Sequence, residues 1–81
     1  MDASELKDIL WNNIVNEYNR ERILSAVRKG QPATVGAVAE ALEMDRAVVF
    51  KYMVDLENSG QVRMMDVVDN APRYILIGEV D

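Results

Sequence analysis

The chain has 81 residues and a formal net charge of −5, from nine basic and fourteen acidic side chains. This length fits one domain with a single modest core and excludes two. Cys and His are both absent, which excludes disulfides and thiolate metal sites and removes the commonest general base. No phosphate-cradling glycine-rich loop or nucleophile motif is present either, so we expect no enzyme, no metal site and no cofactor.

Apolar residues make up 49% of the chain and the charges are mixed in sign, which favours a folded globular protein. No apolar run approaches the roughly 20 residues of a membrane span. The first residues, MDASELKD, lack a basic region followed by an apolar one. A soluble, cytoplasmic protein is therefore expected. Its acidic balance lowers the expectation of a duplex-DNA partner, because DNA affinity depends on neutralising phosphates.

Residues 3–18 are expected to form a helix, with Asp2 and Glu5 at capping-box spacing. Apolar side chains cover roughly two-thirds of its circumference, whereas packing on one core needs a stripe nearer 100° wide. The apolar side chains outside that stripe need a second element or a second chain to cover them. Either the helix is wedged between the core of its own domain and the hairpin near the C-terminus, or it forms a homodimer interface. The side chains of that candidate interface are Leu10, Trp11, Ile14, Val15 and Tyr18.

A second helix is expected to begin near residue 20, with Asn19 as its N-cap and Gly30 as its stop. Alternatively, the chain continues as one long helix, because no helix-breaking residue separates the two segments. The chain is expected to divide into an N-terminal packing or dimerisation helix, residues 1–19, and a domain, residues 20–81. The buried face of the second helix is expected to consist of Ile23, Leu24 and Val27.

Gln31-Pro32 is expected to break the helix, because the residue before a proline disfavours helical backbone. Ala33-Thr34 then fits a short first strand, and Thr34 also fits the N-cap of a helix over Val35–Leu42. Gly36 weakens the first turn of that helix by roughly 1 kcal/mol.

A turn at Glu43-Met44 leads to a third helix, Arg46–Ser59, for which Asp45 is the expected N-cap. Gly60 follows as the left-handed residue that ends it. Val49, Met53 and Leu56 are expected on its buried face.

The C-terminal segment predicts a β-hairpin of two strands, Val62–Val68 and Arg73–Ile77, joined by a turn over residues 69–72. Tyr74 is expected to pack at the base of this hairpin. Met64 and Met65 are expected to pack in the core and the hairpin, rather than to form a redox or metal site.

Residues 20–77 resemble the winged helix-turn-helix family of prokaryotic transcription regulators. The resemblance is carried by VAEAL at residues 38–42, by Asp45 opening the third helix, by GQV at 60–62 and by PRY at 72–74. It implies an α+β, mostly helical fold, with a three-helix core, a two-stranded β-wing and, here, an extra N-terminal helix.

In this family the exposed side of the third helix enters the major groove of DNA and the wing touches the backbone. Arg73 is the best single candidate for a phosphate contact, with neutralisation by the nearby Asp66 and Asp69 as the alternative. Val48 and Phe50 are expected to pack on the first two helices. The candidate nucleic-acid contacts implied by the resemblance are Arg46, Ala47, Phe50, Lys51, Arg63 and Arg73.

Two functions remain open. The first is a small transcription regulator that binds double-stranded DNA as a homodimer through the N-terminal helix. The second is a winged-helix interaction or regulatory subunit that binds a protein partner and no DNA. This chain would bind that partner through the surface formed by Phe50 and Val54, or through the surface formed by Trp11 and Val15.

Overall fold

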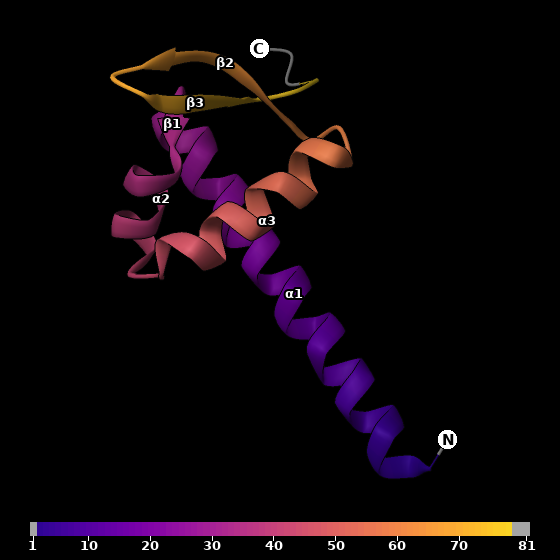
Figure 1. The fold of residues 1–81 in the computed structure, drawn as a ribbon. Helices are drawn as coiled ribbons and strands as arrows, with labels where there is room; N and C mark the ends of the chain where they lie inside the picture. The colour runs from indigo at the N-terminus through magenta and orange to yellow at the C-terminus, as the bar shows by residue number, and fades with distance from the viewer. Residues whose placement is uncertain (1, 79–81) are drawn as a thin grey trace.

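The computed structural model describes residues 2–78 and consists of three helices and one small antiparallel sheet (Figure 1). The helices cross one another on one side of the sheet, whose strand order is β1-β3-β2. The architecture is α+β and mostly helical, as expected. The elements are α1 (Ala3–Gly30), β1 (Ala33–Thr34), α2 (Val35–Leu42), α3 (Arg46–Asn58), β2 (Val62–Val68) and β3 (Ala71–Leu76).

Helix α1 is continuous, which is the second of the two alternatives for residues 3–30. The Asp2 carboxylate caps it by accepting from the Glu5 backbone N–H at 2.9 Å, as the spacing predicts. Asn19 is not a cap. It lies within α1, and its side-chain amide donates to the Tyr52 hydroxyl at 3.1 Å.

The N-terminal half of α1 projects away from the rest of the protein (Figure 1). With this projecting half included, the molecule measures 48 × 28 × 19 Å along its principal axes. The residues of α1 that are buried, Ile23 and Val27, both lie in its C-terminal half. Trp11 is 64% exposed and Tyr18 is 62% exposed. The expectation that this helix is wedged between core and wing is therefore wrong, because α2, α3 and the sheet all pack around its other half.

The core forms where the three helices meet the sheet. Each of its larger side chains contributes about 1.5–3 kcal/mol to folding when fully buried. Leu24, expected to be buried, is partly buried against this cluster. The fully buried side chains are Ile23, Val27, Val38, Val49, Met53, Leu56 and Val62.

Local caps set the bounds of α2 and α3. Thr34 Oγ1 accepts from the Ala37 N–H at 3.0 Å, and Asp45 Oδ1 accepts from the Ala47 N–H at 2.8 Å. Glu43 adopts left-handed backbone (φ 55°) between the two helices. Helix α3 is followed by Gly60 with φ 78°, as expected of a residue after a helix C-terminus.

The hairpin turn is shorter than the sequence suggests. It consists of Asp69 and Asn70 alone, with φ values of 52° and 64°, and both residue types tolerate this left-handed backbone. Ala71 and Pro72 belong to β3, opposite Val68 and Val67, so the predicted four-residue turn is wrong. Strand β1 pairs only with residues 73 and 74 of β3, so the missing N–H of Pro72 interrupts no pairing with β1.

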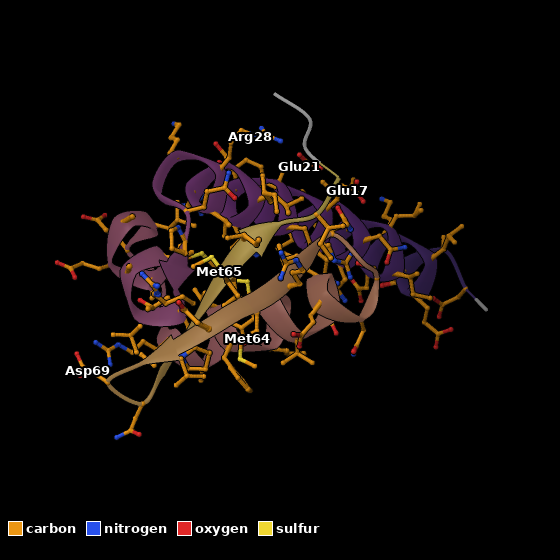
Figure 2. The ribbon with its side chains drawn as sticks, turned by 90° about the horizontal axis from the view of Figure 1, so that it is seen from above. Glu17, Glu21, Arg28, Met64, Met65 and Asp69 are labelled. Carbon is orange, nitrogen blue, oxygen red and sulfur yellow. The ribbon has the colours of Figure 1, made fainter. Side chains whose placement is uncertain are left out.

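Tyr74 packs at the base of the wing with 5% of its surface exposed, as predicted, and burial raises the pKa of its hydroxyl. Met64 and Met65 do not pack as expected. They are 46% and 42% exposed on β2 (Figure 2). Strand β2 lies at the edge of the sheet, and its register shifts between Met64 and Asp66, so the two side chains are not covered.

Candidate nucleic-acid interface

Helix α3 is fixed against the core along one side. Val49, Met53 and Leu56 are fully buried, in agreement with the predicted spacing. Tyr52 adds a polar tie to α1, because its hydroxyl donates to Asn16 Oδ1 at 2.7 Å and accepts from Asn19 at 3.1 Å. The opposite side of α3 is therefore held in a defined orientation towards solvent.

That open side carries more apolar surface than charge. Phe50 is 53% exposed and Val48 is 42% exposed, while Val54 is half-buried. Phe50 does not pack on the first two helices as expected, because those helices occupy the side of α3 that carries Tyr52 and Met53. Val48 only borders α1, in a groove that Asn16 and Arg20 also line, and stays 42% exposed. Ala47 and Lys51 are exposed on the same open side.

Arg46 begins α3 and lies across the start of α2. Its guanidinium carbon is 3.5 Å from the position that a Cβ on Gly36 would occupy. The absent side chain of Gly36 therefore leaves room for the guanidinium to lie flat against α2. Arg46 is still exposed and can reach a ligand beside the first turn of α3.

Arg20 of α1 lies beside the candidate side chains of α3, although its position in the sequence did not identify it as a candidate contact. A shallow groove between α1 and α3 is lined by both Arg20 and Lys51, with Asp55 along the same wall. Only the crossing of α1 over α3 brings these cations together. The one sign in the sequence that Arg20 lies there is the possibility that α1 continues past residue 20, as it does.

Arg73, by contrast, is already paired within the wing. Its Nε donates to Asp66 Oδ1 at 2.6 Å and its Nη2 to Asp66 Oδ2 at 2.5 Å, across the β2–β3 ladder. This bidentate hydrogen bond holds the pKa of Asp66 below its usual value and the pKa of Arg73 above its own. Asp69 lies at the tip of the wing (Figure 2), which gives that tip an anionic rather than a cationic end.

The six candidate residues do not form one cluster. Arg46, Ala47, Phe50 and Lys51 share the first half of α3. Arg63 is exposed near the start of β2, beyond the C-terminal end of α3. A helix of this length separates its two ends by about 18 Å. The candidate interface thus has two parts. One is a small patch on α3, which we call the α3 patch, formed by Arg46, Ala47, Phe50 and Lys51 with Arg20 beside it. The other is a separate cation, Arg63.

Neither metal ligation nor a membrane span is found in the part of the chain that the structure describes. Between residues 2 and 78, no three acidic side chains gather in a way that would hold a metal ion. No helix in this range is long and apolar enough to cross a bilayer.

Comparisons with protein-family models and with curated proteins find no match. Among solved structures, the chain is similar to the crystal structure of the apo Zα domain of zebrafish PKZ, with a TM-score of 0.72 and 21% sequence identity. The match covers 78% of this chain and 97% of that one. At this identity the likeness establishes the fold alone. Together with the order of its helices and strands, it shows that the chain has a winged-helix fold.

Proposed function

We propose that this protein is a small winged-helix DNA-binding protein, a transcription regulator of the prokaryotic type. In this proposal α3 enters the major groove and the wing of β2 and β3 lies along the backbone. The observation that carries it is the open side of α3, which is rigidly held and has Arg46 and Lys51 on its first half with Arg20 beside them.

In this proposal Arg46, Lys51, Arg20 and Arg63 make the phosphate contacts, which their exposed positive charges support. Arg73 contributes less, because binding a phosphate would first require it to release Asp66. Three or four phosphate contacts per subunit predict a fall of roughly three powers of ten in affinity for each tenfold rise in salt. DNA binding through this surface is therefore expected to be strongly salt-dependent.

Sequence discrimination is expected to be weak. Arg46 and Lys51 are the long hydrogen-bonding side chains on the first half of α3, and base-edge recognition depends on such groups. Ala47 and Phe50 offer apolar contacts suited to the methyl group of thymine. Shape and deformability of the duplex would then contribute much of any preference.

The direct test is whether the protein retains a labelled DNA duplex at about 50 mM salt and releases it at higher salt. Arg46→Glu with Lys51→Glu should remove retention. Lys29→Glu, which reverses an exposed charge on the last turn of α1, is the matched control and should change it little. Failure of the wild-type protein to retain any duplex at low salt would refute the proposal.

One observation favours a second candidate, a protein-interaction module. Phe50 is 53% exposed and Val54, one helical turn later and half-buried, lies beside it on α3, on a chain whose formal charge is −5. Binding of a protein partner through this surface would be insensitive to salt and would be lost in Phe50→Asp. In the DNA-binding proposal the same substitution should weaken retention, but retention should still depend on salt.

We further propose that the protein acts as a homodimer. The exposed Leu10, Trp11, Ile14 and Tyr18 support this, and Val15, which is half-buried, borders them.

A further inference from the structure

The apolar surface on the N-terminal half of α1 faces away from the domain core. Ile14 and the buried Ile23 are nine residues apart, which is about 900° of rotation in an α-helix, so their side chains leave α1 on opposite sides. The core of the same chain therefore cannot cover Ile14 by any small shift of the helix. Glu17 and Glu21, labelled on α1 in Figure 2, border this surface beside Ile14 and Tyr18, and also line a groove shared with Asp55 of α3.

We call this surface the outer face of α1 and define it by Leu6, Leu10, Trp11, Ile14 and Tyr18. Each of these side chains is between 50% and 64% exposed. At roughly 200 Å² for a large apolar side chain, they expose about 600 Å² in each chain. Two such faces would bury about 1,200 Å², the lower limit for a specific interface.

The charges beside the outer face favour a second copy as its occupant, and they also set its direction. Lys7 lies seven residues before Ile14, and Glu21 lies seven residues after it. Residues seven apart differ by only about 20° in direction, so both charges lie on the outer face with Ile14. A parallel, in-register pair would set Lys7 against Lys7 and Glu21 against Glu21.

We propose that two copies pair through the outer face of α1 in antiparallel orientation, centred on Ile14. Residues equally far before and after Ile14 then face each other. Ile14 meets its own copy, Leu10 meets Tyr18, and Lys7 meets Glu21 twice. The opposed helix dipoles also favour this direction.

This arrangement extends the proposed function by fixing how far apart the two domains lie. Ile23 and Val27 mark the core end of α1. In the antiparallel pair the two copies of Ile23 are about 27 Å apart along the axis, and the two copies of Val27 about 39 Å. This range includes the 34–36 Å of one turn of DNA, the usual spacing of half-sites for dimeric helix-turn-helix proteins. The spacing argument rests on the DNA-binding proposal, whereas the pairing itself does not.

Cysteine cross-linking tests the orientation, because the chain has no native Cys. Ile14→Cys should form a disulfide-linked dimer by itself. Leu10→Cys and Tyr18→Cys should each fail alone, since their own copies lie about 12 Å apart along the axis, but should cross-link when mixed. Asn12→Cys, exposed on another side of α1, is the control and should not cross-link. Equally efficient cross-linking of every single variant would overturn the antiparallel arrangement.

Charge reversal tests the same pairing without a covalent bond. Lys7→Glu or Glu21→Lys should weaken dimerisation roughly tenfold, and the double variant should restore it. The fraction of dimer is measured by sedimentation and by the fluorescence emission of the sole tryptophan, Trp11. A wild-type protein that stays monomeric up to about 100 µM would refute the pairing. If that monomer still retained duplex DNA, the DNA-binding proposal would stand and only this inference would fail.

Discussion

Tyr52→Phe should destabilise the protein measurably, because it removes the hydroxyl that ties α3 to α1. This hydroxyl donates to Asn16 at 2.7 Å and accepts from Asn19 at 3.1 Å, while the ring is 9% exposed. Each hydrogen bond is worth about 0.5–1.5 kcal/mol net. Asn16 and Asn19 are only half-buried and can turn to water, so the full penalty of an unpaired buried group does not apply. We expect a loss of about 1–2 kcal/mol in the free energy of unfolding.

Circular dichroism at 222 nm during urea and thermal unfolding, at one fixed protein concentration, measures this loss. For a domain of this size, a change of 1 kcal/mol shifts Tm by about 4–8 °C. Tyr18→Phe is the matched control at a concentration below that of pairing, because the ring of Tyr18 is 62% exposed in a single chain. A loss below about 0.5 kcal/mol in Tyr52→Phe would show that the tie to α1 does not stabilise the orientation of α3.

Substitutions at Asp66, Gly60 and Asn70, with Gly30 as a control, test the wing and the helix ends. The hydrogen bond from Arg73 holds the pKa of Asp66 below 3.8, so its stabilisation is complete above that pH and is lost as the pH falls further. The stability difference between wild type and Asp66→Asn, from urea titrations at several pH values, should therefore shrink below about pH 4. Gly60→Ala should cost about 1 kcal/mol because φ is 78°, whereas Gly30→Ala, at a helical position with open space around it, should be neutral or stabilising. Asn70→Gly should raise Tm slightly, since φ 64° suits glycine in this two-residue turn, and a lower Tm would contradict the turn assignment.

Local chemistry made much of the fold predictable. The caps at Asp2, Thr34 and Asp45 and the left-handed Gly60 depend on side chains and backbone within a few residues, and all four are confirmed. The buried spacing of α3 depends only on helix geometry, and it too is confirmed. These features agree with one another, which is why the winged-helix outline could be read without a structure.

The failures concern surfaces whose covering is decided by other elements. Phe50 and Met64 are apolar and were expected to be covered, but among residues 2–78 neither is, since they are 53% and 46% exposed. Arg20 reaches the α3 patch only because α1 runs on without a break and crosses α3. No local rule states which side of one element meets another, so the composition of the candidate interface was less predictable than the fold.

The acidic balance of the chain weighs less against DNA binding once the charges are placed in space. Residues 2–21 carry five acids, including Asp2, Glu5 and Asp8, against two bases, which gives −3 of the total of −5. Asp8 precedes Asn16, the residue that ties α1 to α3, by eight positions, or about 12 Å of helix. That distance exceeds the Debye length of about 8 Å at physiological salt. Within one chain the negative potential of Asp2, Glu5 and Asp8 is therefore largely screened at α3. Glu17 and Glu21 instead line a groove with Arg20 and Asp55, and in the proposed pair Asp8 of the other copy faces Arg20, so the positive field at α3 depends on Arg46 and Lys51.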